Sequence, residues 1–551
     1  MKRNLIRISH KGQRKINYCL SIGIFYIFLF SILCCVKTYA TEHSNDQTRN
    51  YISGIIFHDK TGNEQYESEK DVPLEGVAVS NGREIEVTDQ EGRYELPLRD
   101  NSIIFVIKPQ NWMVPIDENQ LPRFYHIHSS DGLSGTEFDG LPPTGEIPES
   151  VNFPLYPVDE PDEYEVLVFG DTQTRNEEEV YYIAHDVLTE LVGNDSEFGV
   201  TLGDVVFDDL DLYPHFNHSI ATVGIPWRNL LGNHDIDFTG DNNEEARGTF
   251  YRTFGPTYYS FSHGPAHYII LDNIRWIVED DSRYYRTGLG EDQMEFLRNE
   301  LSRIGPDKLV VLMAHIPWHG PGGGFYWKDE SERDTLYKIL SRHPNSVSLV
   351  SHHHKHYHRF LDEEEGFPGE QPHHMISVGS VCGAWYTGVP DEYGIPHAMM
   401  SDGTPTSYTF LHIDKNDWKL RWKAARRPAD FQMHIHTPDA ISLDNLSGVN
   451  VTANIFNALP TANVEMRIGD SGPWTDMKRV RKDDPVRVAA LDWEKQLDTI
   501  PWRPLSGLRH FGHVWEAKLN DDLKPGVHVI HVRATDEWWT YEGKRIFRVR
   551  E

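Results

Sequence analysis

The chain has 551 residues and a formal net charge of −31, so it is long enough for several domains and its surface is strongly acidic. Hydrophobic residues make up 39% of the chain and aromatic residues 12%, which excludes a chain that is disordered throughout. An acidic surface repels nucleic acid and anionic membranes. We therefore expect no nucleic-acid partner unless a local basic patch or a bound metal intervenes.

Residues 1–40 have the features of a signal peptide. They carry seven basic residues and no acidic one, and they contain an apolar run at 18–36 that ends before small residues at 38–40. The run is nearly long enough to span a bilayer, so an anchoring helix is the alternative. Because a polar stretch follows at once and no second apolar span exists, we favour cleavage and a periplasmic or secreted protein with no stable membrane span. The mature chain would keep Cys382 as its single cysteine, which excludes an intrachain disulfide.

Short alternating segments follow the predicted signal peptide. Residues 51–57, 74–80 and 93–96 read as strands separated by polar turns, a spacing typical of a small antiparallel sandwich. We place this N-terminal transthyretin- or immunoglobulin-like β-sandwich at residues 48–158. Six prolines between residues 142 and 161 then predict a stiff linker.

The middle and the end of the chain differ in pattern. Between residues 162 and 427, apolar strands at 166–169, 198–202, 309–313 and 347–350 alternate with helical stretches at 177–192, 293–304 and 331–341. This alternation predicts an α/β domain with its polar sites at strand ends. Residues 428–551 revert to strands at 449–456, 464–468, 514–518 and 526–535, which predicts a C-terminal immunoglobulin-like sandwich.

Five polar motifs in the α/β domain each follow an apolar strand. They contain Asp171 with Gln173, Asp204, the run Asn233-His234-Asp235, His315, and the run His352-His353-His354. Two divalent cations a few ångströms apart can hold a phosphate, activate a bridging hydroxide and neutralise charge on the leaving oxygen. Such a site needs one carboxylate that bridges both metals, together with nitrogen and oxygen ligands on each side. The five motifs supply these residue types.

In this order the motifs resemble those of the calcineurin-like metallophosphoesterase superfamily. Its pattern is Asp-x-His, Gly-Asp, Gly-Asn-His followed by Asp or Glu, a lone His, and Gly-His-x-His. The flanking β modules resemble those of an exported, Bacteroidetes-type branch. The resemblance implies a calcineurin-like four-layer β-sandwich with flanking helices between two all-β domains. It also implies two divalent or trivalent metal ions (Mn, Fe or Zn) and hydrolysis of a small phosphate monoester or diester.

The resemblance also implies a role for each motif residue. The first metal would be held by Asp171, Gln173 and His354, the second by Asn233, His315 and His352, and Asp204 would bridge the two. His234 would protonate the leaving oxygen, and Asp235 would tune the orientation and basicity of His234. We expect Asp208 to support the site without ligating a metal.

Two positions depart from the family pattern. Gln173 replaces the usual His, and its amide oxygen is a poorer donor that favours harder ions. Ser351 stands where Gly is usual, so two registers of the last motif are open. We favour His352 with His354, which keeps the small Ser351 in the Gly position, over His354 with His356.

The substrate side is less clear from sequence. Trp385 and Tyr386 lie in a Gly-rich, aromatic stretch after the last motif, and we expect them to rim the substrate pocket, although aromatic residues also commonly fill cores. An alternative function is a protein whose β-sandwiches bind a surface glycan while the middle domain is a non-catalytic scaffold. The nearly complete ligand set favours the enzyme, because decay of a site removes its ligands first.

Overall fold

The computed structural model describes residues 51–280, 282–320, 326–508 and 511–551. The predicted signal peptide, residues 1–40, lies outside these residues. Among the described helices, none is long and apolar enough to cross a membrane.

The N-terminal strands form two small sheets. One has the strand order β2-β1-β9-β7 with β5 also paired to β1, and the other has the order β4-β3-β6-β8. Their bounds are β1 (Tyr51–His58), β2 (Val72–Pro73), β3 (Ala78–Ser80), β4 (Ile85–Val87), β5 (Arg93–Pro97), β6 (Ser102–Ile107), β7 (Trp112–Met113), β8 (Tyr125–His128) and β9 (Phe153–Pro157). The predicted all-β character is confirmed, but part of the predicted linker is strand β9, which runs parallel to β1. The reason is that Phe153 and Leu155 are buried in the core.

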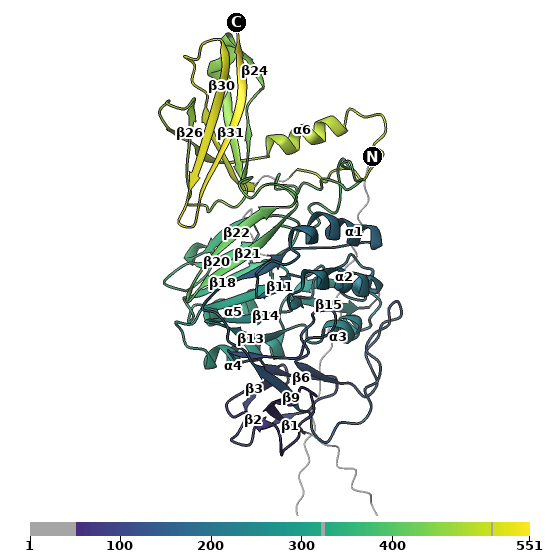
Figure 1. Ribbon diagram of the computed structural model, residues 1–551. Coiled ribbons are helices and arrows are strands. Elements are labelled where there is room, and N and C mark those ends of the chain that lie inside the picture. The colour runs from purple at the N-terminus through teal and green to yellow at the C-terminus, as the bar shows by residue number, and fades with distance from the viewer. Residues whose placement is uncertain (1–50, 281, 321–325, 509–510) are drawn as a thin grey trace, which may run out of the picture. The chain divides into compact units, whose positions relative to one another are not determined.

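Two larger sheets form the middle of the chain (Figure 1). The first has the order β12-β11-β10-β21-β22 and the second the order β13-β14-β17-β18-β20-β19. The strands of the first sheet are β10 (Glu163–Phe169), β11 (Phe198–Thr201), β12 (Trp227–Asn229), β21 (Ser407–Asp414) and β22 (Asp417–Ala424). Those of the second are β13 (Tyr259–His263), β14 (Ala266–Ile270), β17 (Val310–Ala314), β18 (Ser346–Val350), β19 (Tyr357–Leu361) and β20 (His373–Ser377). A separate hairpin joins β15 (Ile274–Glu279) to β16 (Ser282–Thr287).

Alternation along the central strands explains why the sheets stack. Successive side chains of a strand point to opposite faces, and Val166 and Val168 of β10 share a core with Val311 and Met313 of β17. The intervening Leu167 faces a second core, which includes residues of α1 and α2. The outer face of the second sheet packs in the same way against α4 and α5. These layers confirm the predicted four-layer sandwich with flanking helices.

The helices of this domain are short. They are α1 (Glu177–Asp186), α2 (Tyr213–Ile220), α3 (Gly248–Phe254), α4 (Glu291–Arg303) and α5 (Glu330–Leu340). The predicted helix at 177–192 ends early: α1 begins where the Asn176 side chain accepts a hydrogen bond from the Glu179 N–H, and it stops before Val187. A 3₁₀ turn at Leu188–Glu190 replaces the rest.

The C-terminal residues form two further sheets with the orders β23-β25-β29-β28 and β24-β31-β30-β26-β27. The strands are β23 (Met433–His436), β24 (Ala440–Ser442), β25 (Asn450–Ile455), β26 (Asn463–Ile468), β27 (Thr475–Asp476), β28 (Lys478–Lys482), β29 (Phe511–Lys518), β30 (Gly526–Thr535) and β31 (Thr540–Arg550). Their inward residues form one core, so the predicted sandwich character is confirmed. Helix α6 (Pro485–Glu494) was not predicted, although Asp484 caps its first turn and Pro485 is its first residue.

Candidate metal centre

The predicted ligands meet because each follows a strand of one of the two central sheets. β10, β11 and β12 are parallel, and Asp171, Asp204 and Asn233 lie just beyond their ends. β17 and β18 are parallel in the other sheet and are followed by His315 and by residues 352–354. The carboxyl ends of parallel strands meet at the same edge of a sheet, which is where sites form in such folds.

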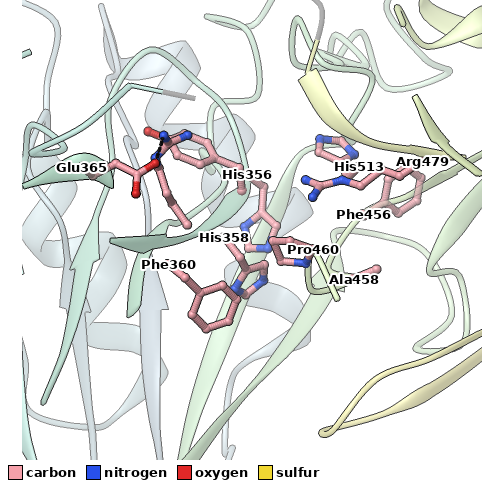
Figure 2. Close-up of a pocket in the computed structure, with 11 residues that line it drawn as sticks. His356, His358, Phe360, Glu365, Phe456, Ala458, Pro460, Arg479 and His513 are labelled. Carbon is pink, nitrogen blue, oxygen red and sulfur yellow. Dashed lines mark hydrogen bonds and ion pairs between the residues drawn. The ribbon is translucent and has the colours of Figure 1, made fainter. Parts of the chain in front are cut away.

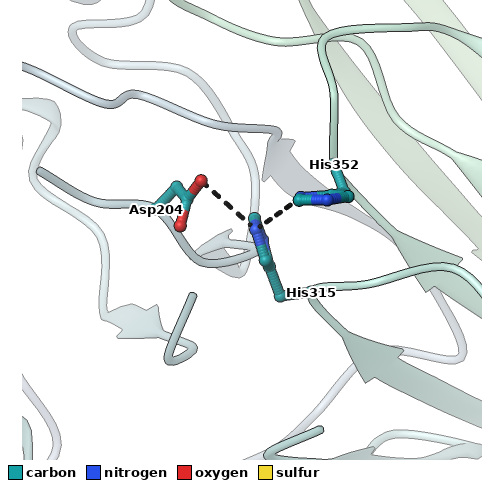
Figure 3. A group of neighbouring side chains, drawn as sticks. All are labelled: Asp204, His315 and His352. Carbon is teal, nitrogen blue, oxygen red and sulfur yellow. Dashed lines mark hydrogen bonds and ion pairs between the residues drawn. The ribbon is translucent and has the colours of Figure 1, made fainter. Parts of the chain in front are cut away.

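One group of ligand atoms gathers around His315 (Figure 3). Its Nε2 lies 3.3 Å from Asp204 Oδ2, 3.2 Å from His352 Nδ1 and 3.2 Å from Asn233 Oδ1. Ligand atoms of Asp204, His315 and His352 all lie within 4.8 Å of one another, and all three residues are buried. This is a suitable donor set for a divalent cation.

A second group lies around Asp171 and is joined to the first through Asp204. Asp171 Oδ2 is 3.4 Å from His354 Nε2, and the Gln173 amide donates to Asp204 Oδ2 over 2.9 Å. Asp171 Oδ2 and Gln173 Oε1 are buried oxygens with no hydrogen-bond partner among the described residues. Because leaving buried polar atoms unpaired is costly, these two oxygens fit a site built to bind a cation.

Hydrogen bonds outside the ligand set fix the orientation of the rings. His315 Nδ1 donates to the carbonyl of Leu202 over 2.9 Å, and His354 Nδ1 donates to the carbonyl of Gly383. Each ring therefore directs the lone pair of Nε2 toward the site, which is the usual arrangement for a metal-binding histidine. The Ser351 hydroxyl donates to Asp171 Oδ1, so the departure from Gly at this position adds a hydrogen bond that holds the Asp171 carboxylate.

His234 lies beside these groups and is paired with Asp208. Its Nδ1 is 2.6 Å from Asp208 Oδ1, and its ring stacks on Phe207 with centroids 4.3 Å apart. Burial disfavours the charged imidazole, but the charge of Asp204 and the hydrogen bond to Asp208 outweigh it and raise the pKa of His234. A raised pKa keeps the imidazole protonated, as a proton donor requires.

The predicted role of Asp235 beside His234 is not what the structure shows. Its carboxylate accepts from the N–H groups of Val205, Val206 and Gly232. The side chains of His234 and Asp235 have different partners in this tight turn. Asp235 holds the Asp204 loop, and Asp208 is the carboxylate bonded to His234. Burial and the charge of Asp204 raise the pKa of Asp235 to about 7. The turn requires Gly232, because a Cβ there would lie 2.1 Å from Asp204 N.

Three family models match the chain in succession. The model described as N terminal of calcineurin-like phosphoesterase matches residues 60–140, calcineurin-like phosphoesterase matches 164–356, and C terminal of calcineurin-like phosphoesterase matches 376–541. The chain belongs to the calcineurin-like phosphoesterase family. Purple acid phosphatase 13 of Arabidopsis thaliana is similar at lower coverage: it is 28% identical over 142 residues, which are 24% of this chain and 24% of that protein.

Backbone strain is found around the candidate metal centre of this member of the family. Several non-glycine residues here have positive φ values, a region that costs an L-residue about 1 kcal/mol or more. They are Gln173 (42°), Asp204 (50°), Asp208 (67°), His353 (61°), His354 (53°), Trp385 (56°) and Tyr386 (49°). Such strain persists where the surrounding structure holds a side chain in a functional position.

The alternative register, His354 with His356, places one of its histidines away from the ligand groups. His356 Nε2 lies 2.8 Å from Asn457 Oδ1, and its Nδ1 accepts from the Gly379 N–H. His358 Nε2 lies 3.0 Å from the same Asn457 oxygen. His356 and His358 line a pocket of about 260 Å³ together with Phe456 and His513. Figure 2 shows these four side chains. The ring nitrogens of His356 are therefore bonded to Gly379 and Asn457 and not to the ligand groups.

The two residues predicted to rim the pocket have different surroundings. The Trp385 ring is partly exposed and lies 4.1 Å from the His354 ring, centroid to centroid. Tyr386 is buried, and its hydroxyl donates to the Thr172 carbonyl over 3.0 Å. Trp385 is thus the rim residue of the pair, and Tyr386 packs behind the Asp171 loop.

Other residues at the site were not predicted. Arg175 packs over Phe207 with its Cζ 4.3 Å from the ring centroid, and Cys382 Sγ lies 3.3 Å from His354 Nδ1. Arg175 and Phe207 lie within four residues of Asp171 and Asp204, so their closeness to two motifs was an available signal. The sequence held no comparable signal for Cys382 beyond its position in the Gly-rich stretch.

Proposed function

We propose that this chain is an exported, metal-dependent phosphoesterase that hydrolyses a small phosphate monoester or diester. The observation that carries the proposal is the pair of unpartnered buried oxygens, Asp171 Oδ2 and Gln173 Oε1, beside the imidazoles of His315, His352 and His354. Most buried polar atoms in a folded protein have a hydrogen-bond partner. Two open oxygens that lie beside three imidazoles and the Asp204 carboxylate suit a ligand with positive charge.

Seven residues would hold two metal ions. The first ion would take Asp171, Gln173 and His354, the second would take Asn233, His315 and His352, and Asp204 lies between the two groups. When bound, such ions supply Lewis acidity that holds the phosphoryl group, activates water and neutralises charge on the leaving oxygen. With an amide oxygen at position 173, we expect Mn or Fe to be favoured over Zn.

The protein's own groups complete the reaction. With Nδ1 of His234 bonded to Asp208, Nε2 is the atom left to deliver a proton to the leaving oxygen. Phe207 stacks on the ring and fixes its plane. Asp235 secures the loop that carries Asp204 through backbone N–H groups, which keeps acid and ligands in register.

Charge and the N-terminal residues support the proposed substrate class and location. A chain with a net charge of −31 disfavours long polyanions, which supports a small ester over a nucleic acid. The basic stretch and apolar run in residues 1–40 support export to the periplasm or beyond.

Metal analysis of the purified protein, followed by turnover of a chromogenic phosphate ester, tests the proposal. We expect about two metal ions per chain and hydrolysis that is lost on chelation and restored by added manganese, iron or zinc. A protein that binds no metal and shows no turnover with any of these ions would overturn the proposal. Matched monoesters and diesters with leaving groups of equal acidity would then establish which class is preferred.

A further inference from the structure

Two arginines meet at one backbone carbonyl on the rim of the metal centre. Arg175 Nη1 donates to the Trp385 carbonyl over 3.1 Å and Arg503 Nη1 donates to the same oxygen over 3.0 Å. The Trp385 ring contacts His354, whose Nε2 faces Asp171. Trp385 is therefore in contact both with the two guanidinium groups and with the ligand His354. They come from segments more than 300 residues apart in the chain.

The positive charge at this point is only partly neutralised. In the described residues, the ion pairs of both arginines go to one carboxylate, that of Glu179, which is 3.4 Å from Arg175 Nη1 and 3.6 Å from Arg503 Nη1. A net positive spot at the mouth of a site in so acidic a chain attracts anions.

Arg503 is held in place by the segment that carries it. Its carbonyl accepts from the Gly388 N–H over 2.9 Å. The neighbouring residues Trp502 and Leu505 donate to the Glu494 carboxylate at the end of α6 over 2.8 and 2.9 Å. The Arg503 side chain nevertheless remains 43% exposed. A guanidinium that is anchored but accessible still has N–H donors for a ligand, and its planar fork matches an oxyanion.

Arg175 links the same spot to the proton donor. Its guanidinium packs on Phe207, and Phe207 stacks on His234. A substrate whose leaving group lies at His234 would thus extend past Phe207 toward Arg175 and Arg503. In that pose the two arginines would lie on the side from which the leaving group departs.

We propose that Arg175 and Arg503 form a second anion subsite, and that the natural substrate carries a second oxyanion, either a phosphate or a carboxylate, on its leaving group. This inference rests on the proposed phosphoesterase function. It narrows the substrate to an ester with a second anionic group besides the phosphate that is hydrolysed. It also makes Arg503 a specificity-determining residue.

Three aryl substrates test the subsite. Phenyl phosphate has no second anion, meta-carboxyphenyl phosphate adds a carboxylate, and meta-phenylene bisphosphate adds a phosphate. We expect the metal-loaded enzyme to have a kcat/KM about tenfold higher for the two substrates with a second anionic group than for phenyl phosphate. Tenfold is the scale of one charge-assisted hydrogen bond. The substrate with the larger advantage identifies which oxyanion the subsite takes.

Variants of two arginines with similar exposure provide the comparison. Arg503→Gln should abolish the preference for a second anionic group, mainly through a higher KM for the two substrates that carry one. Arg298→Gln is the matched control, since Arg298 is 46% exposed and also pairs with a carboxylate, that of Glu295, but lies on α4. If Arg503→Gln lowers kcat/KM equally for all three substrates, the arginine only secures the Trp385 loop and the subsite is refuted. No preference in the wild type refutes it as well.

The two proposals fail in different ways. Absence of turnover on every ester tested removes the proposed function, whereas turnover of phenyl phosphate without a preference for a second anion removes only the subsite. In a protein without turnover, calorimetric binding of inorganic pyrophosphate against inorganic phosphate decides the subsite. Tighter binding of pyrophosphate that is lost in Arg503→Gln supports it, and equal binding in both proteins overturns it.

Discussion

Asp208 Oδ1 lies 2.6 Å from Nδ1 of His234, and this contact determines which nitrogen of the imidazole can donate a proton to a substrate. The carboxylate is partly exposed, at 43% of its side-chain surface, and it has no place among the ligand atoms around Asp204. It therefore acts on the proton donor without acting on the metal site. Asp208 and the metal ligands can be tested separately for this reason.

Substitution Asp208→Asn should move the basic limb of the pH–kcat profile to lower pH. The proton donor must be protonated to act, so the rate falls as the pH rises through the pKa of His234. Asp208 helps to raise that pKa, and without its charge the imidazole loses its proton earlier. Rates measured across pH with the metal-loaded enzyme check this, and metal content should stay unchanged.

A control for this variant is Asp211→Asn. Asp211 is exposed, lies three residues further along the chain in a 3₁₀ turn (Leu210–Leu212), and has no hydrogen bond or ion pair to His234 among the described contacts. Its replacement should leave the profile where it was. A basic limb that stays in place in Asp208→Asn would show that another group is the proton donor.

Asp204→Asn and His234→Asn should separate metal binding from proton transfer. Asp204 lies between the two ligand groups, so its replacement should lower metal content and activity together. His234→Asn should keep both ions and lose about 10²- to 10⁴-fold in kcat, which is the usual contribution of general acid catalysis. Elemental analysis and single-turnover rates check this pair. If His234→Asn loses its metal, the division between acid and ligands is wrong.

Much of this site could be predicted because its residues follow apolar strands. An apolar run followed by Gly and a carboxylate predicts the end of a buried strand, and parallel strands bring their ends together. That reasoning located the loops of Asp171, Asp204, Asn233 and His315. The four-layer sandwich was implied by the resemblance to the family and did not follow from these strand ends.

The sequence could not show which side chains face one another across the tight turns. Whether Asp208 or Asp235 meets His234 depends on the direction of two consecutive residues after Gly232, which no periodicity encodes. The position of His356 depends on Asn457, about 100 residues later. Arg503 reaches the rim from a segment after α6, so its role depends entirely on tertiary packing.

The last histidine motif gives a third prediction. His354→Ala should reduce metal affinity by about tenfold or more, because its Nε2 faces Asp171. His356→Ala should leave metal affinity nearly intact and lower the free energy of unfolding by about 1–3 kcal/mol, because the buried Gly379 N–H would lose its acceptor. Metal titrations and urea unfolding of both variants check this. The reverse result would establish the alternative register.

A fourth prediction concerns acid sensitivity and three buried histidines that lie in the second central sheet or directly before its strand β19. Burial lowers the pKa of His356 to about 4, that of His373 to about 4, and that of His374, which also lies beside His373, to about 3. These values lie below the ordinary value of 6.5, so the unfolded chain takes up protons first as the pH falls. The stability contributed by neutral imidazoles is fully present above pH 6.5 and should be lost progressively between pH 6.5 and about 4.

Urea unfolding at pH 7 and pH 5, with metal removed by a chelator, checks this prediction. Each unit by which a histidine pKa is lowered corresponds to about 1.4 kcal/mol, so the difference between the two pH values should be several kcal/mol. His374→Phe should reduce that difference, because His374 already packs against aromatic rings and phenylalanine does not titrate. His218→Gln, a change at an exposed histidine of α2, should leave the difference unchanged. Equal stability at the two pH values would mean that these imidazoles become protonated in the folded chain without cost, contrary to their burial.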